Sequence, residues 1–145
     1  MAGKTITSAN AVYQLVIDGL FLVPQQLQGF AADTAFATEA RSTKELVRGV
    51  DGNLSAGYVF SNIVQTISIM PDSPSLRVFD EWQNAEEVAH EAYACSATIL
   101  IPSIGRKYAC TRGFLTSAPP IVSVNRTLAA QAFQITWQKI ISEPY

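Results

Sequence analysis

The sequence has little charge, little histidine and cysteine, and no long apolar run. Only 15% of its 145 residues are charged, and the formal net charge is −2. This balance excludes the broad basic surface with which proteins wrap nucleic acid. No apolar run approaches the roughly 18 residues of a membrane-spanning helix, so we predict no membrane contact. The stretch MAGKTITSANAVY has one lysine and no apolar core, so we expect no secretory signal there.

The chain has two cysteines, Cys95 and Cys110, and one histidine, His90. The cysteines have no further cysteine or histidine at metal-ligand spacing, which excludes a zinc framework. We interpret the two cysteines as small core or strand residues that stay reduced, because disulfides rarely persist in the cytoplasm. The alternative is that the cysteines form a disulfide, within or between subunits, in a particle that leaves the cell. Cys95 and Cys110 are therefore also candidates for an inter-subunit cross-link.

The stretch EWQNAEEVAHEAYAC, residues 81–95, places Glu87 and His90 at the Glu-x-x-His spacing of helical metal sites. Di-iron bundles need such a pair on two helices and further glutamates on two more, whereas this sequence offers one helix. A zinc-protease motif needs a second histidine where this chain has a glutamate. A Cys95–His90 pair has no third group to orient it for catalysis. We therefore predict no metal, no cofactor and no enzymatic activity, and interpret the carboxylates as a solvated or subunit-facing side of the helix.

Apolar residues make up 48% of the sequence, and many of them alternate with polar ones. In NIVQTISIM, for example, Ile63, Ile67 and Ile69 fall on one face, as in a strand with one buried side. Pro24, in the run FLVPQQLQGFAADTAF, favours an edge strand or the start of a strand. The short apolar or alternating stretches predict strands over residues 11–17, 62–70, 95–102, 107–117 and 129–141.

One helix is predicted over about residues 74–92, with Ser73 as its N-cap and Pro74 at its first position. Its apolar residues recur at spacings of three and four, which makes one stripe that docks the helix onto the strands. The stripe consists of Val78, Trp82, Ala85 and Ala89. Strands on both sides of a single helix predict a mainly β fold, an antiparallel β-sandwich or partly closed barrel with one flanking helix.

The most polar stretch, residues 37–59, contains three glycines and a VDGN turn. We predict that it forms a long hairpin or loop of a single domain spanning residues 1–145. Its charges are of mixed sign, which favours subunit contacts over nucleic-acid binding. The candidate contact residues are Arg41, Lys44, Glu45 and Arg48.

Four stretches resemble the tail tube proteins of contractile-tailed bacteriophages. They are VDGNLSAGYV, IVQTISIMPDSPSLRVFDEW, SATILIPSIGRKYACTRGFLTSAPP and FQITWQKI. The similarity runs in order from about Thr5 to Ile141 and concerns structural features, not catalytic ones. Cys95 and Cys110 lie outside the family's pattern.

The resemblance implies two packed antiparallel sheets with a flanking helix, in a structural protein of the virion. Copies would form hexameric rings that stack into a hollow inner tube, assembled in the host cytoplasm. The tail sheath protein would surround the tube, and the lumen would hold the tape-measure protein and later DNA, without sequence-specific binding. The low charge fits, because copies would cover most of the surface.

We expect residues 37–59 to reach an adjacent ring. The alternatives are a tube-end adaptor or a ring protein of the secretion-system type, with a small metalloenzyme as the weaker hypothesis.

Overall fold

The computed structural model describes residues 11–28, 30, 36–121, 124 and 126–144. Within these residues the chain forms strands, one helix and then more strands, which confirms the predicted mainly antiparallel β fold. The helix is α1 (Leu76–Ala89). The strands are β1 (Val12–Ile17), β2 (Phe21–Gln26), β3 (Phe36–Thr38), β4 (Lys44–Arg48), β5 (Leu54–Tyr58), β6 (Ile63–Ile69), β7 (Cys95–Ile101), β8 (Arg106–Ser117) and β9 (Gln131–Pro144).

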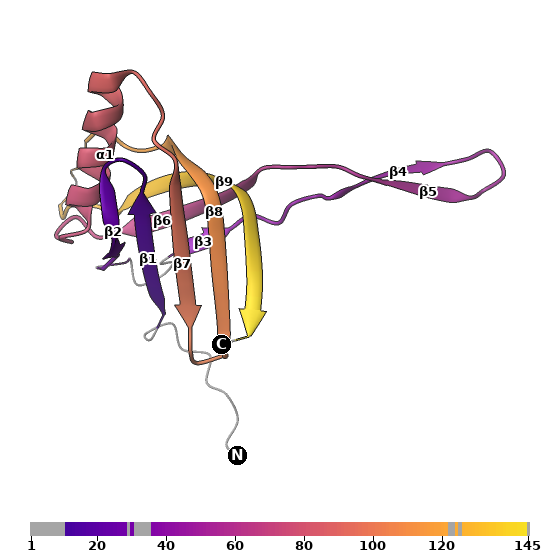
Figure 1. Ribbon diagram of the computed structural model, residues 1–145, viewed down its shortest axis with the longest axis horizontal. Helices are drawn as coiled ribbons and strands as arrows, with labels where there is room; N and C mark the ends of the chain where they lie inside the picture. The colour runs from indigo at the N-terminus through magenta and orange to yellow at the C-terminus, as the bar shows by residue number, and fades with distance from the viewer. Residues whose placement is uncertain (1–10, 29, 31–35, 122–123, 125, 145) are drawn as a thin grey trace, which may run out of the picture.

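Seven strands form one continuous sheet in the order β2-β1-β7-β8-β9-β6-β3, and β4 pairs only with β5. The long strand β9 joins the two halves of the sheet, because it pairs with β6 over its first residues and with β8 from Gln134 to Pro144. Figure 1 shows that β1, β7 and β8 run at a steep angle to β6. The fold is therefore a single bent sheet, a partly closed barrel, and the two layers implied by the resemblance are its two halves.

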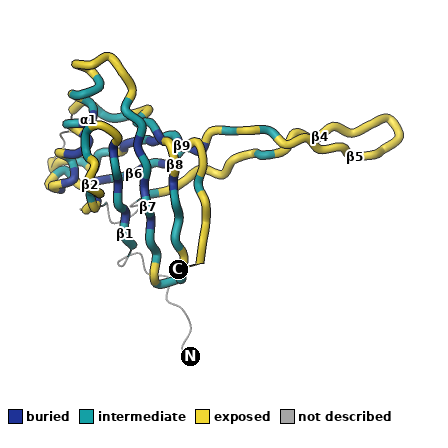
Figure 2. The backbone as a smooth tube through the Cα atoms, in the orientation of Figure 1, coloured by how far each residue is buried: buried dark blue, intermediate teal, exposed yellow. Residues whose placement is uncertain are grey.

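The core fills the inside of this bend. Alternate residues of β1, β6 and the first half of β9 are buried, as the twofold periodicity of a strand requires. The helix adds Phe79, which stacks on Phe133 of β9 with 4.2 Å between ring centroids. Figure 2 shows the buried segments gathered along these strands and the inner side of α1.

The helix starts two residues later than predicted. Pro74 and Ser75 belong to a preceding turn, in which the Leu76 amide donates to the Ser73 carbonyl at 3.3 Å. The Ser73 hydroxyl accepts from the Ser75 amide at 3.2 Å, so it supports this turn instead of capping the helix. A proline after a serine fits a turn as well as it fits a first helical position, and the sequence alone does not separate the two.

The apolar stripe of α1 is shorter than the sequence indicates. Val78 and Trp82 are buried and Ala85 is half-buried, but Ala89 is exposed. In Figure 1 the last turns of α1 extend past the end of the sheet, so Ala89 has no strand to pack against. The helix ends at Ala89, three residues before the predicted end at residue 92, because His90 adopts a left-handed φ of 55°.

The hairpin of β4 and β5 projects from the body as an extended arm (Figure 1), and we call residues 43–59 the arm. The Val59 amide donates to the Thr43 carbonyl at 2.9 Å and closes its base. At its tip, Gly52 has a φ of 88°, which only glycine adopts readily. The stretch predicted as a hairpin or loop over residues 37–59 is thus a hairpin from residue 43 that turns at the VDGN sequence, whereas Ala37 and Thr38 belong to β3 of the main sheet.

Candidate assembly surfaces

The arm has two different faces. Directly opposed residues of antiparallel strands point to the same side, and here Lys44 opposes Tyr58 while Arg48 opposes Leu54. The Lys44 Nζ lies 4.9 Å from the centroid of the Tyr58 ring, as this register requires. Glu45 lies on the other face. We call the first side the basic face of the arm; it consists of Lys44, Leu46, Arg48, Leu54, Ala56 and Tyr58.

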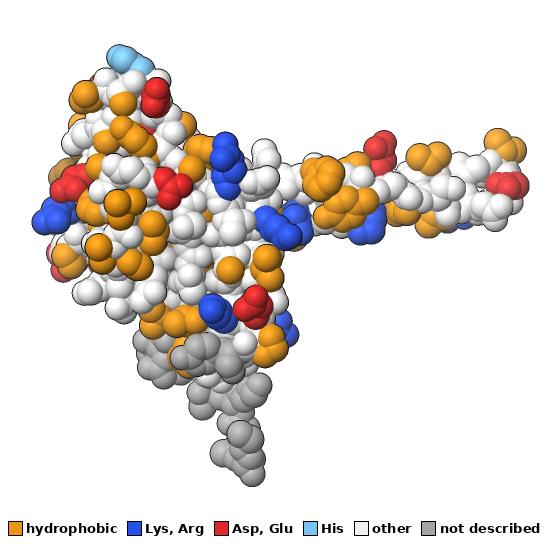
Figure 3. Space-filling view, viewed as in Figure 1, with side chains coloured by type: hydrophobic (Ala, Val, Ile, Leu, Met, Phe, Trp, Pro, Cys, Tyr) orange, Lys and Arg blue, Asp and Glu red, His pale blue; other side chains and the backbone are white. Residues whose placement is uncertain are grey.

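The rest of the chain leaves the apolar residues of the arm uncovered. Leu46, Leu54 and Tyr58 are 58%, 55% and 58% exposed on the basic face. Val50 at the tip and Phe60 beside the base are more exposed still. Figure 3 shows apolar side chains along the length of the arm. Monomeric soluble proteins rarely expose a contiguous apolar surface of this kind, so it marks the arm as a contact surface for another molecule.

A buried polar network fixes the strand that leads into the arm. Gln65 of β6 is 1% exposed, and its Oε1 accepts from the Tyr13 hydroxyl at 2.7 Å and from Trp137 Nε1 at 3.1 Å. Its Nε2 donates to Thr38 Oγ1 of β3 at 3.3 Å. Burial raises the pKa of Tyr13 well above its ordinary value, which keeps the phenol protonated as a donor. Gln65 was not among the predicted residues, although a polar side chain on the apolar face of an alternating strand was a usable sign.

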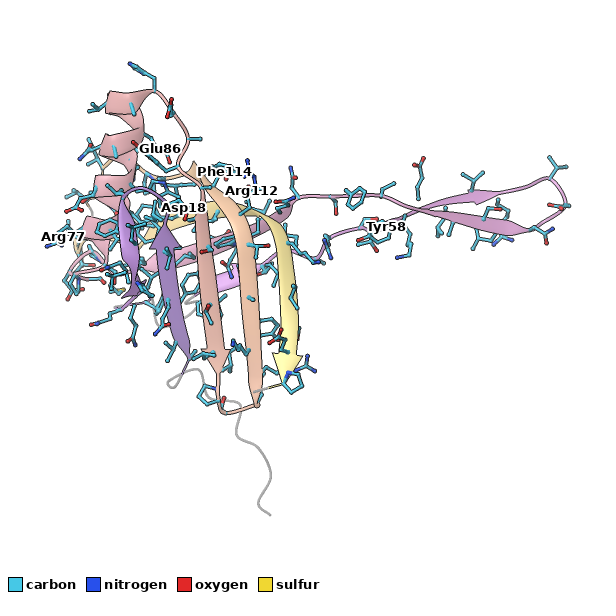
Figure 4. The ribbon with its side chains drawn as sticks, viewed as in Figure 1. Asp18, Tyr58, Arg77, Glu86, Arg112 and Phe114 are labelled. Carbon is cyan, nitrogen blue, oxygen red and sulfur yellow. The ribbon has the colours of Figure 1, made fainter. Side chains whose placement is uncertain are left out.

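A hollow of about 390 Å³ lies at the base of the arm. Arg41 and Arg112 both line it, together with Phe60, Phe114 and Trp137. The Arg112 guanidinium lies 5.6 Å from the Phe114 ring centroid, and Figure 4 shows both side chains where β8 and β9 meet the arm. In the described part of the chain neither arginine has a carboxylate partner. Of the four predicted contact residues, Arg41 therefore belongs to this hollow, Lys44 and Arg48 to the basic face, and Glu45 to the opposite face.

The outer side of α1 is acidic. Asp80 and Glu87 are exposed there, Val88 beside them is 84% exposed, and the exposed Arg77 on the same side pairs with Glu81. Asp80 and Glu87 are two helical turns apart and lie on the same side of the helix. We call Asp80, Glu87 and Val88 the acidic face of α1. Figure 4 shows Glu86 on α1 and Tyr58 on the arm, on opposite sides of the body.

Among the described residues, no group of three or more histidine, cysteine, aspartate and glutamate residues could hold a metal ion. The predicted half-motif of Glu87 and His90 lies on exposed surface at the helix end. The His90 amide donates to the Glu86 carbonyl at 2.8 Å, and the left-handed φ of His90 ends the helix after this bond. In the same part of the chain, no helix is long and apolar enough to cross a membrane.

Cys95 and Cys110 are free thiols on neighbouring strands, and each is 1% exposed. Burial raises the pKa of Cys110 to about 12 and raises that of Cys95 as well, so both stay protonated and poorly reactive. This burial opposes the predicted cross-link to another subunit, which stays a prediction. A non-reducing gel of assembled particles tests it, and the cross-link requires a band above the monomer.

The fold of this chain is similar to that of chains in two solved structures of the anti-feeding prophage. A chain in the structure of the anti-feeding prophage cap, the AFP tube terminating cap, is 15% identical, with a TM-score of 0.58 over 100% of this chain and 95% of that one. A chain of the AFP baseplate is 10% identical, with a TM-score of 0.57 over 99% and 98%. These likenesses define a phage-tail-tube-like fold.

The family model of tail fiber protein gp32 matches residues 4–141, so the chain belongs to that family. No curated relative matches the sequence. Family and fold together confirm the predicted resemblance and assign the chain a structural, tail-related role.

Proposed function

We propose that this chain is the subunit of the inner tube of a contractile tail, in which hexameric rings stack into a hollow cylinder. The arm is the observation that carries the proposal, because it extends apolar and charged residues beyond the packed body, where only another molecule can cover them. The tail family and the fold shared with a tube-terminating cap support this setting. The role is structural, and the chain catalyses no reaction.

Rings close through the edges of the sheet. β2 is one edge and β3 the other. Leu22 and Val23 on β2 are 77% and 70% exposed, which is apolar surface at an unpaired edge. Pro24 lies beside them where the register with β1 shifts, and it blunts the edge against open-ended pairing. A head-to-tail contact between two unlike edges closes into a ring when its rotation allows.

The arm joins one ring to the next. Lys44, Glu45 and Arg48 project from its two faces, and Arg41 lies at its base. The Gln65 network holds β3 to the core and so fixes the direction in which the chain leaves the body. A hairpin held at its base in this way loses less conformational freedom on docking than a free loop does.

The outer face of β1, β7 and β8 lines the lumen. Gln14, Ser96, Thr98 and Thr111 lie around one shallow hollow on this face, and they are small or uncharged. Lys107 shares this face, since it is two residues from Ala109 on β8, but the wall around the hollow is uncharged. A wall with few cations suits a conduit for the tape-measure protein and for DNA, because cations would hold the phosphates. The sheath surrounds the tube in the virion, and the particle is assembled in the host cytoplasm.

A tube-end adaptor is the second candidate, favoured by the likeness to the tube-terminating cap. Negative-stain images of the purified protein distinguish the two. A tube subunit forms rings that stack into filaments of uniform width, whereas a tube-end adaptor stops at one ring. Replacing residues 43–59 with a short Gly-Ser turn should leave rings and abolish stacking. A wild-type protein that stays monomeric at high concentration contradicts both candidates.

A further inference from the structure

Two oppositely charged surfaces lie at opposite ends of this molecule. The arm projects to one side of the body and α1 stands at the other (Figures 1 and 3). The basic face of the arm holds Lys44 and Arg48, and the acidic face of α1 holds Asp80 and Glu87. Because the arm points away from the helix, these surfaces cannot meet within one subunit. They can meet only between two copies in a head-to-tail arrangement.

The spacing of the charges agrees on the two surfaces. Lys44 and Arg48 are four residues apart on a strand, which separates them by roughly 13 Å. Asp80 and Glu87 are seven residues apart on a helix, which separates them by about 10 Å. Lysine and arginine side chains are long and flexible enough to span the remaining difference. Each cation therefore has one carboxylate within reach when the strand lies along the helix.

Both surfaces also leave apolar residues and charges without partners. Leu46 and Leu54 on the arm are more than half exposed, and Val88 on α1 is 84% exposed. Within the described residues, the ion pair formed on α1 is Arg77 with Glu81, at 3.2 Å, and it leaves Asp80 and Glu87 unpaired. Lys44 lies over the Tyr58 ring and Arg48 donates to the Gly52 carbonyl, and neither pairs with a carboxylate of the described residues.

We propose that the basic face of the arm docks on the acidic face of α1 of a copy in the adjacent ring. This inference rests on the proposed tube function and names the partner surface of the arm. Docking buries Leu46, Leu54 and Val88, and this burial of apolar surface supplies the affinity. The charge pairs fix the direction and register of docking. The contact is heterologous, so every ring offers free arms on one side and free helices on the other, and stacking continues in one direction.

Charge reversal on each surface tests the docking. One variant carries Lys44→Glu and Arg48→Glu, and the other carries Asp80→Lys and Glu87→Lys. All four positions are exposed, so circular dichroism and melting temperature should match the wild type. Each variant alone then presents like charges at the contact, and we expect rings with at least a tenfold loss of filament mass in sedimentation. The milder pair Lys44→Gln with Arg48→Gln should lose less.

An equal mixture of the two charge-reversed variants provides the decisive measurement. The acidic arm of the first fits the basic helix of the second, and the basic arm of the second fits the acidic helix of the first. We therefore expect the mixture to regain filaments, built of alternating rings. The control Glu143→Lys reverses an exposed charge near the end of β9, outside both surfaces, and should stack as the wild type does.

The outcomes separate this inference from the tube function. A wild type that forms no filaments overturns the tube function itself. A wild type that forms filaments, with reversed variants that stack normally or a mixture that stays as rings, overturns the arm–helix docking and leaves the tube function standing.

Discussion

Gln65 provides the hydrogen-bond acceptor for two donors that are buried in the core. Its Oε1 accepts from both Tyr13 and Trp137, and all three side chains are buried. Gln65→Leu would leave two buried donors unpaired, and each such donor costs about 1–3 kcal/mol. We expect the free energy of unfolding to fall by about 3 kcal/mol in urea denaturation.

The double variant Tyr13→Phe with Gln65→Leu controls for this loss. It leaves Trp137 as the one unpaired donor of the network, so it should be more stable than Gln65→Leu alone. If the double variant is less stable than the single one, the hydrogen bond from Tyr13 is not the source of the effect.

The buried ionisable groups predict a loss of stability at alkaline pH. Burial raises the pKa of Cys95, Cys110 and Tyr13 in the folded protein. In the unfolded chain the two thiols have an ordinary pKa of about 8.5. The stability that comes from keeping them neutral is fully present below that pH and is lost as the pH rises toward the folded pKa. The expected slope is up to about 1.4 kcal/mol per pH unit for each thiol. Urea denaturation across this range measures it, and Cys110→Ala should remove about half of the thiol contribution; an unchanged slope contradicts the assignment.

The pairing of β8 with β9 depends on a glycine. Gly113 opposes Trp137, and a Cβ at Gly113 would overlap the indole ring, with Trp137 Cδ2 only 2.9 Å away. Gly113→Ala should therefore cost about 2–3 kcal/mol of unfolding free energy, because the buried ring has little room to move. The matched control is Gly57→Ala in the arm, where no atom lies within 4 Å of the added carbon. The control should change stability by less than about 0.5 kcal/mol, and equal losses in the two variants would refute the steric argument.

The strands were predictable because their signal is local. In β6 and β9, apolar residues alternate over seven positions or more, and the buried side chains match that alternation. Pro24 correctly marked an edge strand, since β2 ends the sheet. The start of α1 and the exposure of Ala89 were not predictable, because they depend on where the sheet ends in space. The pairing of β9 with both β6 and β8, which bends the sheet, has no local sign either.

The candidate site was predictable only in outline. The sequence indicated that residues 37–59 form an exposed segment of mixed charge, and residues 43–59 of this segment form the arm. Which residues share a face depends on the register of Lys44 with Tyr58, and that register is fixed by the turn around Gly52. The Gln65 network joins residues up to 72 positions apart, a distance over which no local pattern extends.

Ring closure and ring stacking use separate surfaces in the proposed tube, so they should fail separately. Leu22 lies on the edge strand β2 and is 77% exposed, and Ile121 is equally exposed in the β8–β9 connection. Leu22→Lys places a desolvated charge in the ring contact, whereas Ile121→Lys keeps its charge in water. We expect Leu22→Lys to give folded monomers and Ile121→Lys to give normal rings, with mass photometry and negative stain as the measurements. The arm-deleted protein should show the converse, intact rings without filaments. Rings formed by Leu22→Lys would show that β2 is not the closing edge and would move the ring contact elsewhere on the subunit.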